Sequence, residues 1–352
     1  MKVGILGYPQ VGKTTLFAML TKLEKNVGVS SSAVETSMGV AKVNDPRLSI
    51  LTGMFNPKKT IPATLDLVDL GGFGKKEALR NVDVLIHVVR AFLDDAVPHA
   101  NGEVDPARDI ASMELELIIS DLAWIEDRLA KIDRELKKMP KAGLEPEKKL
   151  LARFRTQLEA ERPLRELELH DDEVKLILGY GFLSLKPMLF VLNVSEEALA
   201  QPDDDKIGAK LDSYVDKPNT RILSVCAKIE AELAQLSSED ASLFMTDLGL
   251  DEPGLDRLAR EAYRLLGRIS FFTVGPDEVR AWPIRQGTFA KQAAAAIHSD
   301  IERGFIRAEV VHYDDFIQHE SMAACKEKGV FRLEGKEYLV REGDMINFRF
   351  NV

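Results

Sequence analysis

The chain contains only two cysteines, Cys226 and Cys325, in 352 residues. They lie far apart in the sequence, so no disulfide framework is expected and a reducing compartment is favoured. Long apolar runs are also missing: the stretch from Val82 to Val89 is far shorter than the roughly 20 residues that cross a bilayer. A strand pattern begins at residue 2, which leaves no room for a signal peptide. These features predict a cytoplasmic protein with no membrane partner.

Basic residues are in the minority. The chain has 47 Lys and Arg against 57 Asp and Glu, a net charge of −10, which argues against a protein that coats nucleic acid. Residues 128–155 reverse this balance, with ten basic residues, four acidic residues and a local charge of +6. This run is either a solvated helical surface or a partner-binding surface, and the sequence leaves both interpretations open. The length and the 45% apolar content predict two or three soluble domains.

A phosphate-binding loop is the strongest feature that the chain does contain. The run from Gly7 to Thr14 fits the pattern G-x-x-x-x-G-K-[ST] without a gap. A strand pattern precedes it and an amphipathic helix pattern follows it, as such a loop requires. We expect Lys13 to neutralise the β- and γ-phosphates and the Thr14 hydroxyl to ligate Mg²⁺. The predicted phosphate-binding residues are Gly7, Pro9, Gln10, Val11, Gly12, Lys13, Thr14 and Thr15.

A second phosphate-sensing element follows a strand pattern at Asp69-Leu70-Gly71-Gly72. Its D-x-x-G spacing predicts that Asp69 holds the Mg²⁺ through water and that the Gly72 backbone N–H contacts the γ-phosphate. The next residue is Phe73, where many switch NTPases carry a glutamine that orients the attacking water. Another group must therefore position the water, or turnover is slow.

The run Asn193-Val194-Ser195-Glu196 stands where guanine-binding proteins carry N-K-x-D. The lysine that covers the base is missing, and the carboxylate is on a longer side chain. Loss of the guanine-specific set, with Asn193 kept for the N7/N6 edge, favours ATP over GTP. Two alternatives stay open: a conventional GTPase in which Glu196 pairs with guanine, and a turn that merely caps a helix.

The strand patterns predict the architecture of the nucleotide-binding part. Apolar, β-branched runs at 65–69, 84–89, 188–192 and 221–225 are separated by helical patterns, which predicts an α/β fold with a doubly wound parallel sheet. We assign residues 1–111 and 183–267 to this P-loop NTPase (G) domain. After Gly267 the sequence pattern changes to one of short strands and turns, which predicts a separate α+β domain at 268–352.

Residues 112–182 interrupt this fold with a coiled-coil pattern. Apolar residues spaced by three and four are Leu115, Ile118, Leu122, Ile125, Leu129, Ile132 and Leu136. A Pro- and Gly-containing turn follows at 139–146, and Leu151, Phe154 and Leu158 continue the spacing beyond it. The pattern predicts an antiparallel helical hairpin that projects as an arm.

Taken together, these motifs resemble the YchF, or Obg-like ATPase, family of P-loop NTPases. Besides the loop and Asn193–Glu196, the shared segments are Asp45-Pro46-Arg47-Leu48, Cys226-Ala227-Lys228, Glu230–Leu233, Glu278–Trp282, Gly304–Glu309, Glu334–Lys336 and Phe350–Val352. The resemblance implies a G domain interrupted by a coiled-coil arm and followed by a β-grasp TGS domain. It also implies binding and hydrolysis of ATP with Mg²⁺, a monomer, and association with ribosomes through the arm and the TGS domain.

Further site residues follow from the same resemblance. Asn193, Val194, Glu196, Cys226 and Ala227 would surround the base. His99, in the run His99–Pro106, would replace the missing glutamine beside Lys13 and Gly72 as a catalytic residue, a role that suits an imidazole.

Two segments depart from the family pattern. Ala33 stands where a Mg²⁺-facing threonine is expected, with Thr36 out of register, and the glycine-rich stretch after Gly72 is short. A nucleotide-binding ribosomal module with little turnover is therefore a second hypothesis.

Overall fold

The computed structural model describes residues 1–21, 37–69, 76–94, 96–138, 144–200, 211, 214–215 and 217–351. The chain divides into two compact units. The N-terminal unit comprises Met1–Gly39 and Asp66–Leu258, and the C-terminal unit comprises Val40–Leu65 and Ala259–Val352. Residues 40–65 thus group with the end of the chain, although the sequence analysis placed them in the nucleotide-binding domain.

The first sheet has the strand order β2-β4-β1-β5-β6-β7. The strands are β1 (Lys2–Leu6), β2 (Ser37–Val43), β4 (Ala63–Asp69), β5 (Val84–Ala91), β6 (Met188–Val194) and β7 (Thr220–Val225). The pairs β1–β4, β1–β5, β5–β6 and β6–β7 are all parallel, as predicted for the strands that contain 65–69, 84–89, 188–192 and 221–225. β5 and β6 are buried along their full length, as expected of strands covered on both faces.

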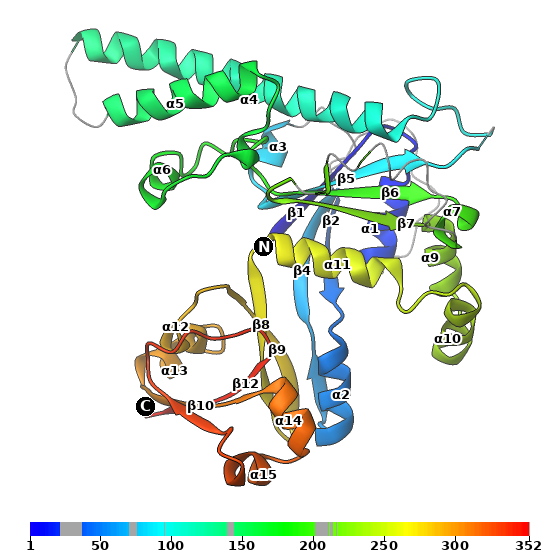
Figure 1. The fold of residues 1–352 in the computed structure, drawn as a ribbon, viewed down its shortest axis with the longest axis vertical. Coiled ribbons are helices and arrows are strands. Elements are labelled where there is room, and N and C mark those ends of the chain that lie inside the picture. The colour runs from blue at the N-terminus through cyan, green and yellow to red at the C-terminus, as the bar shows by residue number, and fades with distance from the viewer. Residues whose placement is uncertain are drawn as a thin grey trace. The chain divides into compact units, whose positions relative to one another are not determined.

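Helices connect these strands, as Figure 1 shows for the N-terminal unit. They are α1 (Lys13–Thr21), α3 (Lys76–Arg80), α4 (Pro106–Lys138), α5 (Leu144–Glu159), η1 (Leu164–Glu166), α6 (Asp171–Leu176), α7 (Glu196–Ala200), α9 (Ala227–Leu233), α10 (Ser238–Asp247) and α11 (Gly254–Leu265), the last of which continues into the C-terminal unit. One core packs the start of α4 against the sheet, through Ile110, Met113 and Leu117 against residues such as Leu85 and Phe190.

Helices α4 and α5 pack along a second core, which contains most of the predicted heptad residues (Figure 1). Ile118, Ile125 and Ile132 of α4 are buried in this core. The α5 residues in it are Leu150, Leu151, Phe154 and Leu158. Leu115 is the exception, since it is 39% exposed. The first turns of α4 instead bury the face that packs on the sheet, so the seam toward α5 begins only at Ile118.

A buried carboxylate holds the base of α4. Asp121 is fully buried, and its oxygens accept hydrogen bonds from the backbone N–H groups of Leu183 (3.0 Å) and Ser184 (2.7 Å) and from the Ser184 hydroxyl (2.8 Å). Arg80, the last residue of α3, forms an ion pair with it at 3.3 Å. Lys186 Nζ donates to the carbonyl oxygens of Arg80 and Val82. These contacts tie α3, α4 and the chain before β6 together.

A buried histidine lies in the middle of β5. His87 is 1% exposed, packs edge-on against the Phe190 ring, and finds no hydrogen-bond partner for either ring nitrogen among the described residues. Burial, together with the positive charges of Lys13 and Arg165, lowers the pKa of His87 from 6.5 to about 3. The imidazole is therefore neutral in the folded protein at every pH at which the protein would be studied.

This histidine should make the protein sensitive to mild acid. Below pH 6.5 the unfolded chain binds a proton at His87 that the folded chain does not, so stability falls as the pH drops from 6.5 toward 3. We expect His87→Leu to remove this component, which is at most about 1.4 kcal/mol per pH unit for one proton. Urea unfolding between pH 7 and pH 4.5 measures it. The exposed His298→Leu control should keep the wild-type slope, and an unchanged slope in His87→Leu would contradict the prediction.

The C-terminal unit is built on a second sheet, with the order β11-β10-β12-β8-β9-β3. Its strands are β3 (Lys59–Ile61), β8 (Arg268–Val274), β9 (Glu278–Arg285), β10 (Phe305–His312), β11 (Arg332–Glu334) and β12 (Asp344–Phe350). Helices α12 (Ala290–Ala295) and α13 (Ser299–Arg303) contribute to its core, and α2 (Pro46–Phe55), α14 (Tyr313–His319) and α15 (Met322–Glu327) complete the unit. β3 pairs in parallel with β9, so residues from 40–65 form one edge of this sheet.

Helix α2 is anchored in the C-terminal unit through Arg47. Its guanidinium binds Asp45 at 2.7 Å, forms a second ion pair with Glu342, and lies over the Phe272 ring, 5.2 Å from its centre. Asp45 also caps α2 by accepting from the backbone N–H of Arg47. At the other end of α2, Phe55 stacks on Phe316. The segment Asp45-Pro46-Arg47-Leu48, which carries part of the family resemblance, thus forms the start of α2 and anchors this helix to the rest of the C-terminal unit.

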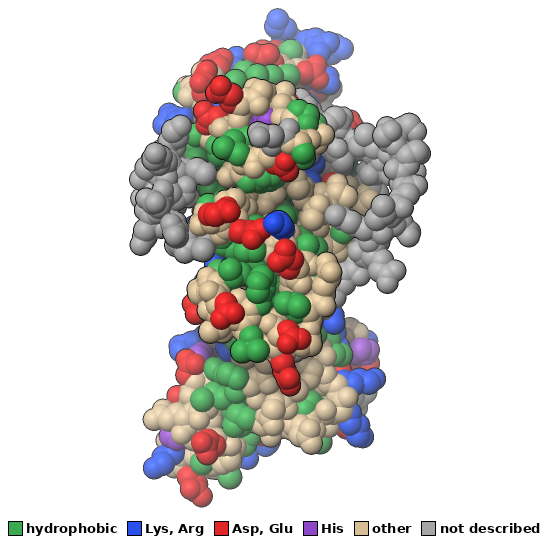
Figure 2. Space-filling view, turned by 90° about the vertical axis from the view of Figure 1, so that its right-hand side faces the viewer, with side chains coloured by type: hydrophobic (Ala, Val, Ile, Leu, Met, Phe, Trp, Pro, Cys, Tyr) green, Lys and Arg blue, Asp and Glu red, His purple; other side chains and the backbone are tan. Residues whose placement is uncertain are grey.

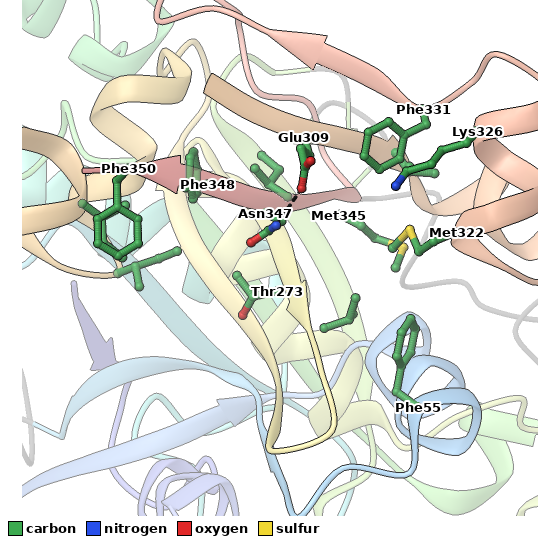
Figure 3. A pocket seen from close by; sticks show the side chains of 15 residues that line it. Phe55, Thr273, Glu309, Met322, Lys326, Phe331, Met345, Asn347, Phe348 and Phe350 are labelled. Atoms are coloured by element: carbon green, nitrogen blue, oxygen red, sulfur yellow. Dashed lines mark hydrogen bonds between the residues drawn. The ribbon is translucent and has the colours of Figure 1, made fainter. Parts of the chain in front are cut away.

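A pocket of about 380 Å³ opens in the C-terminal unit near β8 and β12 (Figure 3). Its walls combine apolar side chains such as Phe55 and Met345 with the charged side chains of Glu309 and Lys326. Glu309 accepts a hydrogen bond from the Asn347 amide at 2.7 Å. All lining residues belong to the C-terminal unit, and none comes from the phosphate loop.

The surface agrees with the acidic composition. On the face drawn in Figure 2, acidic side chains are scattered over much of the surface between apolar ones. None of the helices in the described part of the chain is long and apolar enough to cross a membrane.

Candidate nucleotide-binding site

The predicted phosphate loop joins β1 to α1. Gly7 has a φ of +146°, and a Cβ there would lie 2.3 Å from the Val88 carbonyl oxygen. Gly12 has a φ of +102°, and a Cβ there would lie 2.5 Å from the Asn193 amide nitrogen. Both positions therefore require glycine for close approach as well as for backbone conformation. Between them Pro9 and Gln10 are exposed, and Val11 is buried in the core.

The predicted lysine and metal ligands lie together at the end of this loop. Lys13 is 7% exposed, and its Nζ donates to the Tyr8 carbonyl oxygen at 2.5 Å. The Thr14 hydroxyl lies 3.4 Å from the Asp69 carboxylate, at the carboxyl end of β4. Burial lowers the pKa of Lys13, and the nearby Asp69 partly offsets this effect. A hydroxyl beside a carboxylate fits the oxygen ligands that Mg²⁺ prefers.

Asn193 joins the phosphate loop to the predicted base-binding segment. Its amide nitrogen donates to the Val11 carbonyl oxygen at 3.0 Å, and its amide oxygen accepts from the Ala227 N–H at 3.0 Å. One amide hydrogen remains for a ligand. Asn193 and Val194, with 5% and 3% exposure, are buried. The Asn193 side chain therefore connects β6 to the phosphate loop and to the start of α9. The sequence pattern did not predict this structural role.

Glu196 is paired with a residue that the sequence analysis did not assign to the site. Lys228 Nζ lies 2.5 Å from Glu196 Oε1, with side-chain exposures of 72% and 42%. Cys226, before α9, is 2% exposed, and burial raises the pKa of its thiol. Ala227 and Lys228 begin α9, so the Asn193–Ala227 hydrogen bond also fixes the backbone beneath Lys228.

The side chain of His99 is buried beside α4. It is 2% exposed, and Nε2 lies 2.9 Å from Oδ2 of Asp109, although this pair is not aligned as a regular hydrogen bond. Nδ1 accepts from the Asn101 backbone N–H at 3.1 Å. Asp109 also accepts from the side chains of Asn101 and Arg108. Nδ1 is thus occupied by a backbone donor, and Nε2 faces a carboxylate of α4.

The remaining predicted residues divide into two groups. Thr15 lies in α1, next to Thr14. Gly72, together with Phe73, Ala33 and Thr36, lies outside the described residues. The structure thus brings together Lys13, Thr14, Asp69 and Asn193 through their contacts, with Ala227 joined to Asn193.

Comparison with known proteins finds two family models and several relatives that match the chain. Residues 2–139 match the family model MMR_HSR1, described as "50S ribosome-binding GTPase", and residues 268–351 match YchF-GTPase_C, described as "Protein of unknown function (DUF933)". The chain is similar to the "Ribosome-binding ATPase YchF" of Bacillus subtilis (40% identity, 100% of both chains) and of Escherichia coli O157:H7 (37% identity, 100% of this chain and 99% of the relative).

A solved structure supports the same relationship. The structure of the Schizosaccharomyces pombe YchF GTPase matches 99% of this chain and 97% of its own, with 29% identity and a TM-score of 0.85. With relatives this similar over the whole length, the chain belongs to the YchF family.

Proposed function

We propose that this protein is a slow ATPase that acts as a molecular switch in the cytoplasm, as a monomer, and associates with ribosomes. The phosphate loop carries the proposal, because Gly7 and Gly12 hold backbone conformations that favour glycine while Lys13, Thr14 and Asp69 converge at the end of the loop. The relatives that match end to end are named ribosome-binding ATPases, which supports both parts of the proposal.

In this mechanism the chain's own groups bind and orient the triphosphate. Backbone N–H groups of the loop and Lys13 would bind the phosphate oxygens. Thr14 and Asp69 would hold Mg²⁺, which supplies charge neutralisation between the β- and γ-phosphates when bound. Gly72 would contact the γ-phosphate, and Asn193, Val194, Glu196, Cys226 and Ala227 would surround the base.

Calorimetric titration with ATP and with GTP, both with Mg²⁺, tests the base preference. We expect tighter binding of ATP, and tighter GTP binding would contradict the ATP assignment. Turnover measured with and without ribosomes then separates a switch from a nucleotide-binding module without turnover, since the module would hydrolyse no faster than background in either condition.

A GTPase is the second candidate, and two observations favour it. A carboxylate is retained at Glu196, and the solved relative from S. pombe is described as a GTPase. Guanine would require both oxygens of this carboxylate as acceptors. Displacement of bound ATP by a lower concentration of GTP would establish this alternative.

His99 provides a prediction about hydrolysis. If His99 leaves Asp109 to position water, His99→Ala should lower the turnover number about 10²- to 10⁴-fold while ATP affinity stays the same. Single-turnover hydrolysis and calorimetric titration measure the two quantities. A purely structural His99 would give the opposite pattern, with a lower melting temperature and unchanged turnover in the folded fraction.

The basic segment 128–155 provides a prediction about the proposed arm. Several of its basic residues are already paired, including Lys148, which lies 2.7 Å from Asp133. Lys137, Lys138 and Lys149 are exposed. If they contact RNA phosphates, changing all three to Glu should weaken ribosome co-sedimentation. The slope of log affinity against log salt concentration should also become shallower by roughly two to three.

A matched control carries the same change of charge elsewhere. The exposed lysines for it are Lys58, Lys175 and Lys291. This triple Glu variant should keep most of the binding. Equal losses in both triple variants would show that only net charge matters and that the segment is plain solvated surface.

A further inference from the structure

The ion pair between Lys228 and Glu196 has a chemical consequence for base recognition. Glu196 begins α7 directly after β6, and Lys228 lies in the first turn of α9 directly after β7. β6 and β7 are parallel neighbours, so both residues follow the carboxyl ends of adjacent strands. Their charged groups meet at 2.5 Å and remain accessible, with 42% and 72% exposure. A ligand at this edge would therefore meet the pair and not a lone carboxylate.

The pair presents one acceptor and one donor side by side. The carboxylate of Glu196 accepts hydrogen bonds, and the ammonium of Lys228 has three N–H groups, of which one is directed to Glu196. Adenine presents the matching edge, since its 6-amine donates and its N1 accepts. Guanine presents the reverse at these two positions, since its O6 accepts and its N1–H donates, and its 2-amine adds a second donor.

We propose that Lys228 is a specificity-determining residue, which donates a hydrogen bond to adenine N1 while Glu196 accepts from the adenine 6-amine. This inference rests on the proposed ATP-binding function and names the groups that read the base. In the same pose guanine would be opposed at both positions, because its N1–H would face the ammonium and its O6 would face the carboxylate. Asn193 supports the arrangement by holding Ala227, next to Lys228, at 3.0 Å.

The test uses 1-deaza-ATP, which keeps the 6-amine and has a C–H in place of N1. The full-length wild type should bind ATP about tenfold more tightly than 1-deaza-ATP, the effect of one hydrogen bond from a charged donor. In Lys228→Met, which keeps the length of the side chain, this ratio should fall to about one, and the preference for ATP over GTP should narrow by a similar factor.

Two further variants serve as controls. Lys228→Arg keeps a cationic donor and should retain most of the tenfold ratio. Lys217→Met removes a lysine that pairs with Glu166 at 3.1 Å before β7, at the other end of that strand, and should leave the ratio unchanged. Calorimetric titration gives the affinities, and thermal melts establish that each variant is folded.

The outcomes separate this inference from the proposed function. Wild-type protein that prefers GTP would overturn the proposed ATP binding. Wild-type protein that prefers ATP but binds 1-deaza-ATP equally well would overturn only the role of Lys228. An unchanged ratio in folded Lys228→Met would overturn it as well.

Discussion

Replacing Lys13 with alanine is expected to weaken ATP binding by about 10²- to 10⁴-fold, the effect of losing about two hydrogen bonds from a charged donor. Lys13 is the cation of the phosphate loop, and its Nζ lies at the Tyr8 carbonyl oxygen inside that loop. Calorimetric titration with ATP and Mg²⁺ measures the loss. Lys58→Ala, at a lysine that is 80% exposed, is the control and should bind ATP normally.

Lys13→Met, which keeps the length of the side chain, should lose the same affinity, and this loss should not result from unfolding. Burial lowers the pKa of Lys13, so the folded protein holds this proton less tightly than the unfolded chain. At pH 7 the buried charge therefore opposes folding, and stability from this group rises with pH toward 10.5. We expect Lys13→Met to unfold at the same or a higher urea concentration than wild type without nucleotide. ATP affinity within a factor of two of wild type would contradict the assigned phosphate site.

Replacing Asp121 with alanine should lower the free energy of unfolding by about 3–5 kcal/mol, as expected when one partner of a buried ion pair is removed. The change would leave the backbone N–H groups of Leu183 and Ser184 without acceptors and Arg80 without its counter-ion. Burial raises the pKa of Asp121, although these hydrogen bonds and Arg80 oppose the shift. Urea unfolding followed by circular dichroism measures the loss.

An exposed carboxylate on the same helix is the control. Asp127 pairs with Lys131 at 2.5 Å, and its side chain is 62% exposed. Asp127→Ala should change the free energy of unfolding by less than about 1 kcal/mol, as for other surface pairs. Equal effects of the two substitutions would show that the buried cluster does not hold the base of α4.

The sequence was sufficient for elements whose signal is local. The strand and helix on either side of Gly7–Thr14 and the parallel pairing of the strands depend on spacing along a short stretch, and the structure shows both. The spacing from Ile118 to Ile132 is also local, and these residues of α4 pack against α5. Leu115 fits the same spacing but faces outward, because the neighbouring turns of α4 pack on the sheet. Periodicity alone does not show which of two apolar faces a helix will bury.

Features that depend on distant residues were not predictable. Arg47 meets Glu342 across 295 residues of sequence, so no local pattern indicates that α2 belongs to the C-terminal unit. Asn193 matches a base-binding motif, but its bonds to Val11 and Ala227 emerge only from the folded chain. The pairing of Lys228 with Glu196 likewise depends on two loops that follow different strands.

The division of the chain has a consequence for dissecting the protein. The polypeptide passes between the two units three times, after Gly39, after Leu65 and after Leu258. A protease that nicks the backbone near residue 258 would leave the halves tethered through both other crossings. A gene fragment encoding only 268–352 would lack β3 and α2, leaving β9 with an open edge and Phe272 without the Arg47 guanidinium. Isolating that half therefore calls for a fusion in chain order, in which 40–65 is joined directly to 259–352.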